Sequence, residues 1–79
     1  MYSVLFRDQA DNSLFTMAID AVLYDPETEG MLFYSTSGNE IVISDITQEE
    51  SNALVKNLYL EKNLDMTAHP AYLNPEEIE

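Results

Sequence analysis

Apolar and polar residues alternate through the first half of the chain, which is the pattern of half-buried β-strands. Residues 2–6 alternate and contain the β-forming side chains of tyrosine, valine and phenylalanine. In residues 14–24 the odd positions are all apolar: Phe15, Met17, Ile19, Ala21 and Leu23. Helix is the competing interpretation of this run, because leucine, methionine and alanine also suit helices, but the flanking turn residues favour a strand. Residues 31–36 and the β-branched segment 41–44 complete a set of four predicted strands.

Short turn sequences separate these strands, so consecutive strands are expected to pair antiparallel as a β-meander. Residues 8–13 form a polar loop rich in turn-forming residues. In the turn over residues 25–30, Pro26 sets its own φ, and Gly30 is expected to take a positive φ that closes a bulged hairpin. Gly38 and Asn39 supply the tight turn before the fourth strand.

The sequence predicts one α-helix over about residues 47–62. Thr47 and Glu50 have the spacing of a capping box, in which each side chain accepts a hydrogen bond from the backbone amide of the other residue. Asn63 is the expected left-handed residue after the helix. The apolar stripe of this helix consists of Leu54, Val55 and Leu58, extended along the same line by Ser51 and Lys62.

After the helix, three apolar residues alternate with polar ones, which permits a short fifth strand over residues 64–69. Pro70 is expected to end that strand, because proline cannot donate to a strand ladder. Residues 74–77 have the pattern of a helix start, but the chain has room for one turn or a frayed tail only. The predicted fold class is therefore α+β: a four-stranded antiparallel β-meander followed by one α-helix, with a single domain over residues 1–69 and an acidic C-terminal tail over residues 70–79.

The net charge of the chain limits the kinds of partner that it can bind. The 79 residues include 15 acidic and 3 basic residues, for a formal net charge of −12, and no cysteine. Such a surface repels phosphate backbones and anionic membranes, so direct nucleic-acid and membrane binding are disfavoured, whereas a basic protein would be attracted. The alternative is that the charge serves only to keep a small protein soluble. The N-terminus lacks the segments of a signal peptide, and no apolar run reaches the roughly 20 residues of a membrane span, so we expect a cytoplasmic protein.

The chain offers few candidates for metal binding or catalysis. Asp25, Glu27 and Glu29 match the first half of a calcium-binding loop, but the twelfth position is Thr36 rather than glutamate, and a hairpin turn explains the same residues. His69 is the only histidine, with no predicted orienting partner or nucleophile. The sequence therefore predicts no enzyme, no cofactor and no metal site.

Asp20 lies within the most apolar predicted strand, where burial of a carboxylate without a partner would be costly. It is expected either to face solvent or to pair with Arg7, the only base in the strand region.

Apolar side chains occupy both faces of the predicted sheet, and a single helix covers only part of one face. An uncovered apolar face usually marks an interface, and a homodimer is the commonest solution. The candidate interface residues are Phe33, Tyr34, Tyr24 and Val42. In the alternative arrangement, the chain after Pro70 folds back and covers the second face with Tyr72, Leu73 and Ile78.

The sequence thus favours a small, acidic, non-enzymatic protein-interaction module that forms a homodimer. The alternative function is a nucleic-acid mimic that inhibits a basic DNA- or RNA-binding protein, which requires the carboxylates to lie on one face at phosphate-like spacing. A small enzyme or ligand-binding domain assembled at a dimer interface is the third class.

Overall fold

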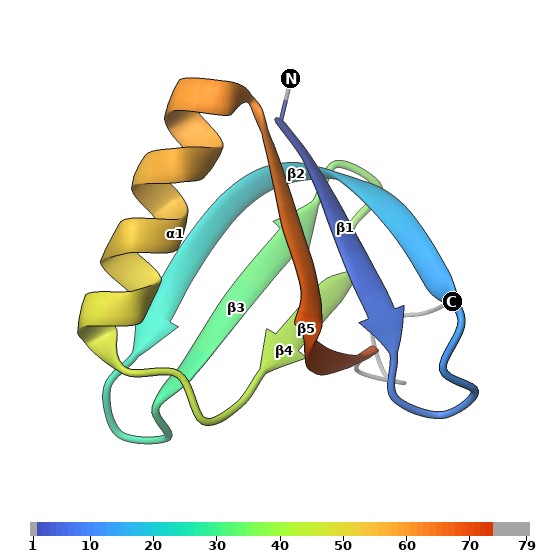
Figure 1. Cartoon of the computed structure of the whole chain (residues 1–79), viewed down its shortest axis with the longest axis horizontal. Helices are drawn as coiled ribbons and strands as arrows, with labels where there is room; N and C mark the ends of the chain where they lie inside the picture. The colour runs from blue at the N-terminus through green and yellow to red at the C-terminus, as the bar shows by residue number, and fades with distance from the viewer. Residues whose placement is uncertain (1, 74–79) are drawn as a thin grey trace.

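The computed structural model describes residues 2–73 and has an α+β fold of five strands and one helix (Figure 1). In chain order the elements are β1 (Tyr2–Asp8), β2 (Leu14–Asp25), β3 (Gly30–Ser35), β4 (Glu40–Ile43), α1 (Gln48–Glu61) and β5 (Asn63–Leu73). The four strands and the helix predicted from the sequence are all present, with bounds that differ by at most two residues.

The five strands form a closed barrel in the order β1-β2-β3-β4-β5. Strands β1 to β4 pair antiparallel as the predicted meander. Strand β5 then pairs antiparallel with β4 and parallel with β1. The predicted open sheet is therefore replaced by a barrel, which needs a long-range parallel pairing that local patterns do not encode.

Strand β5 is longer than predicted and continues through Pro70. The prediction that Pro70 ends the strand was wrong, because this position needs no ladder donor. Pro70 lies opposite Arg7 at the end of an irregular stretch in the β1–β5 register, and the β4 pairing begins only at Tyr72. Residues 70–73 thus belong to the barrel, while the expected frayed end, residues 74–79, lies outside the described residues.

A register shift in β2, between Ile19 and Ala21, changes which side chains point into the barrel. Before the shift the odd positions point inward, and Ile19 is 3 % exposed. After it the phase reverses, so that Leu23 is 55 % exposed while Val22 packs against the core. A β-bulge has this effect because one extra residue inverts the two-residue period of a strand.

The core fills the barrel and extends under the helix. Phe6 lies at its centre, with its ring centroid 5.1 Å from that of Phe33 in an edge-on arrangement and 5.6 Å from that of Phe15. The buried apolar residues are Val4, Phe6, Ile19, Met31, Phe33, Ile41, Ile43, Ile46, Leu58, Met66 and Ala71.

Helix α1 stands beside the barrel and packs mainly against β5, β1 and β2 (Figure 1). Its N-terminus has the predicted capping box between Thr47 and Glu50, with the Glu50 amide donating to Thr47 Oγ1 at 3.1 Å and the Thr47 amide donating to Glu50 Oε1 at 3.2 Å. The left-handed residue at its other end is Lys62, with φ of 64°, rather than the predicted Asn63. Asn63 is instead the first residue of β5, so the helix ends one residue earlier than expected.

The two glycines serve different purposes. In the β2–β3 turn the positive φ belongs to Glu29, at 53°, and not to Gly30 as predicted. Gly30 favours close packing instead, because a Cβ atom at this position would lie 3.2 Å from the carbonyl oxygen of Ile43, a tight contact. Gly38 has a φ of 95° in the β3–β4 turn, which favours glycine.

Helix docking can be tested with two leucines of α1 that differ in burial. Leu58 is 1 % exposed and Leu60 is 69 % exposed. Because Leu58→Ala leaves a cavity between helix and barrel, we expect it to lower the free energy of unfolding by about 2–5 kcal/mol, measured by urea denaturation. Leu60→Ala is the matched control and should change it by no more than about 0.5 kcal/mol. Similar losses from both variants would contradict the packing of α1 described here.

Candidate functional site

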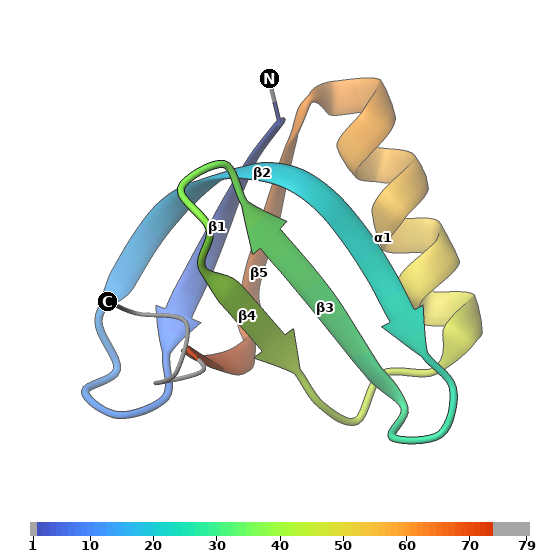
Figure 2. The same cartoon turned by 180° about the vertical axis from the view of Figure 1, so that it is seen from behind.

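The outward side chains of β2, β3 and β4 form two rows across three strands. In the first row Leu23 pairs with Leu32, which pairs with Val42. In the second row Ala21 pairs with Tyr34, which pairs with Glu40. We call the apolar part of these rows the outer β2–β4 face; its members are Ala21, Leu23, Leu32, Tyr34 and Val42. Figure 2 shows the three strands from the side of the barrel opposite β1 and β5.

Two of the four predicted interface residues lie on this face and two do not. Tyr34 and Val42 are half-buried and point outward. Phe33 is fully buried, in contact with Phe6, and therefore cannot form part of a contact surface of the folded chain. Tyr24 lies beyond the β2 bulge and packs against the core, with its hydroxyl donating to the carbonyl oxygen of Ile46 at 2.7 Å.

The predicted interface residues did not include Leu23 and Leu32, which form the apolar row with Val42. Leu23 falls in phase with Phe15, Met17 and Ile19, so simple alternation placed it in the core. The available signal was Asp20, a charged residue within an apolar run, at the site of the register shift. Asp20 is exposed, which agrees with the first of its two expected positions.

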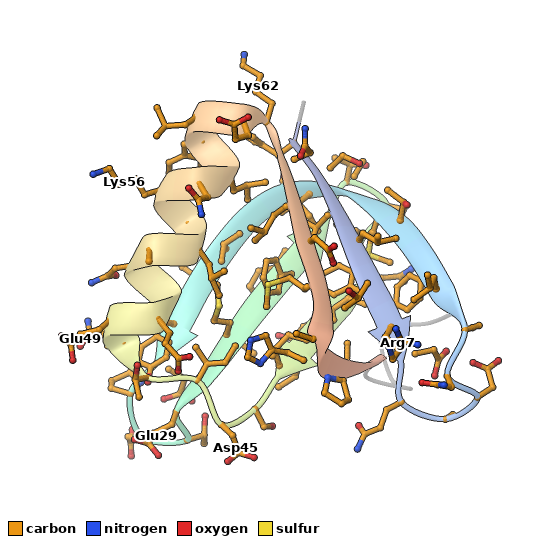
Figure 3. The ribbon with its side chains drawn as sticks, in the orientation of Figure 1. Arg7, Glu29, Asp45, Glu49, Lys56 and Lys62 are labelled. Atoms are coloured by element: carbon orange, nitrogen blue, oxygen red, sulfur yellow. The ribbon has the colours of Figure 1, made fainter. Side chains whose placement is uncertain are left out.

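Charges are unevenly distributed around the barrel. Between Arg7 and Lys56 the chain contains no lysine or arginine, so β2, β3 and β4 carry no base. The three bases lie on β1 and at or near α1, as Figure 3 shows for Arg7, Lys56 and Lys62. Ten acidic residues fall within the base-free stretch: Asp8, Asp11, Asp20, Asp25, Glu27, Glu29, Glu40, Asp45, Glu49 and Glu50.

Several of these carboxylates gather at one end of the barrel, around the β2–β3 turn and the β4–α1 loop (Figure 3). The backbone holds the two segments together, since the Ile46 amide donates to the carbonyl oxygen of Glu29 at 3.0 Å. Loss of hydration on burial raises the pKa of the Tyr24 hydroxyl above its usual value, and the charges of Glu29, Asp25 and Glu50 raise it further. Tyr24 therefore lies in the negative field of this acidic end.

Arg7 connects two irregular segments rather than pairing with Asp20. Its Nε donates to the carbonyl oxygen of Thr67 at 3.2 Å, in the irregular part of β5. Its Nη1 donates to Asn12 Oδ1 at 3.2 Å, in the β1–β2 loop. The neighbouring Asp65 accepts hydrogen bonds from the Thr67 side chain and backbone, which lower the pKa of its carboxyl, and the charge of Arg7 contributes to the same shift. These contacts give Arg7 a structural role.

The residues considered for metal binding lie at the β2–β3 turn, and the histidine considered for catalysis lies in β5. Asp25 Oδ1 accepts a hydrogen bond from the Glu27 amide at 3.0 Å, as expected of a hairpin turn. Within residues 2–73, no three acidic or histidine side chains are grouped closely enough to share a metal ion. His69 is half-buried in β5. No pocket was found in the described part of the chain, and none of its helices has the length and apolar character to cross a membrane.

Comparison with known proteins returned no match to any family model, to any curated protein or to any solved structure.

The role of Arg7 can be tested by two substitutions. Because lysine lacks the planar group that reaches both Thr67 and Asn12, we expect Arg7→Lys and Arg7→Ala each to lower the free energy of unfolding by about 1–2 kcal/mol. Lys56→Ala, which removes an exposed base of α1, should change it by less than about 0.5 kcal/mol. Full stability of Arg7→Lys in urea denaturation would show that charge alone matters at this position.

The environment of Tyr24 predicts a loss of stability in alkali. Because its pKa is raised, the folded protein holds the phenolic proton more tightly than the unfolded chain does. The resulting stability is complete below the unfolded pKa of about 10 and is lost as the pH rises through the folded pKa. In urea denaturation between about pH 9 and pH 11, Tyr24→Phe should therefore lose less stability than the wild type does. Parallel pH curves would contradict this assignment, and Tyr59→Phe, at a 54 % exposed tyrosine, is the control.

Proposed function

We propose that this protein is a non-enzymatic protein-interaction module whose contact surface is the outer β2–β4 face. The observation that carries the proposal is Leu23, which is 55 % exposed and forms one apolar row across three strands with the half-buried Leu32 and Val42. Adjacent apolar side chains that remain partly accessible on a strand face are typical of protein-contact surfaces.

The packing of the rest of the chain supports this choice. The inward side chains of β3 and β4 already complete the core, with Met31, Phe33, Ile41 and Ile43 fully buried. Helix α1 packs mainly on β5, β1 and β2. The apolar side chains on the outside of β3 and β4 therefore have no role in forming that core, and burial against a partner would lower their free energy.

A second copy of the chain, the partner predicted from the sequence, is one candidate for this face. A two-fold dimer through it would place Leu23, Leu32 and Val42 of each copy against the same face of the other. It would also bring together two surfaces that carry acidic residues and no base, which opposes association at low salt. Self-association through this face should thus strengthen when salt screens the charges.

The nucleic-acid mimic is the second candidate function, and the grouping of acidic residues at one end of the barrel favours it (Figure 3). In this case the partner is a basic DNA- or RNA-binding protein, and added nucleic acid should compete with the chain for it. The outer β2–β4 face would then be dispensable, so Leu23→Ser should bind that partner as well as the wild type does.

Site-specific photo-crosslinking tests the proposed surface. A photoreactive phenylalanine analogue placed at Leu23 in the full chain, in its native cells, should give discrete protein adducts on irradiation. The same analogue at Leu60, which is 69 % exposed on α1, is the control and should give none of these adducts. An adduct of twice the 9.0 kDa mass would identify a second copy, and a different discrete mass would identify another protein.

Two outcomes would overturn the proposal. One is an identical set of adducts from positions 23 and 60, which would mean that the face has no preferred partner. The other is a crosslink confined to the chain itself and mapping to residues 74–79, which would mean that the tail covers this face.

A further inference from the structure

We infer that the outer β2–β4 face binds a basic protein, whose contact surface has an apolar centre flanked by lysine or arginine side chains. The inference rests on the proposed function and specifies the partner for the same face. It follows from three properties of the face: its size, the position of its acidic residues and the absence of any base on its strands.

The apolar area is narrow. Two strand spacings separate Leu23 from Val42 across β3, a width of about 10 Å. Leu32 and Val42 are also half-buried already, so a partner could bury less of their surface than of the surface of Leu23. A row of this width accommodates one or two apolar side chains of a partner. Its burial alone provides little affinity once the cost of association is paid, and a specific complex needs further contacts.

Acidic residues supply those contacts along the strand direction. At one end, Asp25 is the next outward position after Leu23, and Glu27 and Glu29 follow in the β2–β3 turn. At the other end, Asp20 lies at the register shift and Glu40 lies opposite Tyr34. The apolar row is therefore flanked by carboxylates on both sides. Because no base lies on these strands, a partner that carries lysine or arginine side chains adds favourable charge contacts along both flanks.

The same arrangement disfavours the other occupants. A second copy would place Asp25 and Glu40 against a surface of like charge. Nucleic acid and anionic membranes would be repelled by the carboxylates. A basic protein can bury apolar side chains against the row and place its bases beside the flanking carboxylates. It is therefore the occupant whose chemistry complements the whole face.

Synthetic peptides can replace the unidentified partner in a binding test. The probe is a short peptide with leucine and phenylalanine at its centre and arginine at both ends. Two control peptides are used. One keeps the apolar centre and has glutamate at both ends, and the other keeps the arginine ends and has serine and glycine at its centre. Backbone amide shifts of the full-length protein, followed by NMR during titration, locate the contact and give the dissociation constant.

We expect the arginine-flanked probe to shift amides of β2, β3 and β4, and each control peptide to bind at least about tenfold more weakly. Raising the salt concentration from about 0.1 M to about 1 M shortens the Debye length from about 10 Å to about 3 Å. The dissociation constant of the probe should therefore rise at least about tenfold. Leu23→Ser and the double variant Glu27→Gln with Glu29→Gln should each reduce binding by a similar factor. Leu60→Ser and Glu61→Gln on α1 are the matched controls and should bind the probe as the wild type does. The melting temperatures of all variants should be unchanged.

Three results would overturn the inference. Equal binding of the probe and of the arginine peptide without an apolar centre, with shifts at acidic residues all around the barrel, would show attraction by net charge only. A dimer in sedimentation experiments that Leu23→Ser dissociates would identify a second copy as the occupant. Position-specific adducts from the crosslinker at Leu23 without any binding of the probe would leave the proposed function intact and reject the basic partner. Failure of both experiments would reject the proposed function as well.

Discussion

The parallel pairing of β1 with β5 is the contact on which the rest of the structure depends. In a meander each strand reverses direction, so the fifth strand has the same direction as the first and can close the barrel only by a parallel ladder. Ser3 pairs with Asn63 at the start of that ladder, which requires β5 to begin at the end of the barrel where β1 begins. The 14 residues of α1 span about 21 Å and carry the chain back to that point. The helix thus connects the end of β4, which lies near the end of β5, to the start of β5.

Closure also decides which apolar surface remains outside. The barrel encloses one side of β3 and β4 completely, and Phe33 and Ile41 are fully buried as a result. The other side of the same strands, with Leu32 and Val42, stays outside because α1 packs mainly against β5, β1 and β2. The bulge in β2 adds Leu23 to that side. A strand with apolar side chains on both faces can contribute one face to the core and leave the other face accessible to a partner.

Local signals in the sequence were sufficient to predict the strands and the helix, but not the closure of the sheet into a barrel. The turn residues, the strand alternation and the capping box at Thr47 each act over a few residues, and they predicted the first four strands and the helix. The positions of Pro70 and Phe33 in the structure depend on long-range contacts, which local signals do not show. Proline is tolerated within β5 because of how that strand pairs, and Phe33 is interior because the sheet closes on itself. The same limit applied to the candidate surface: the pattern placed Tyr34 and Val42 on the outside of the sheet, whereas Leu23 was hidden by a one-residue shift in register.

The late position of β5 in the chain has a consequence during synthesis. Until residues 63–73 have been made, β1 lacks one of its two partners, and the apolar side chains of an incomplete barrel remain accessible to other nascent chains. At about 5–20 residues per second, this interval lasts on the order of 3–12 s after β1 is synthesised. Ten acidic residues and no base lie between Arg7 and Lys56, so incomplete chains repel one another throughout that time. The negative charge therefore disfavours association of incomplete chains during the interval in which β1 lacks its second partner.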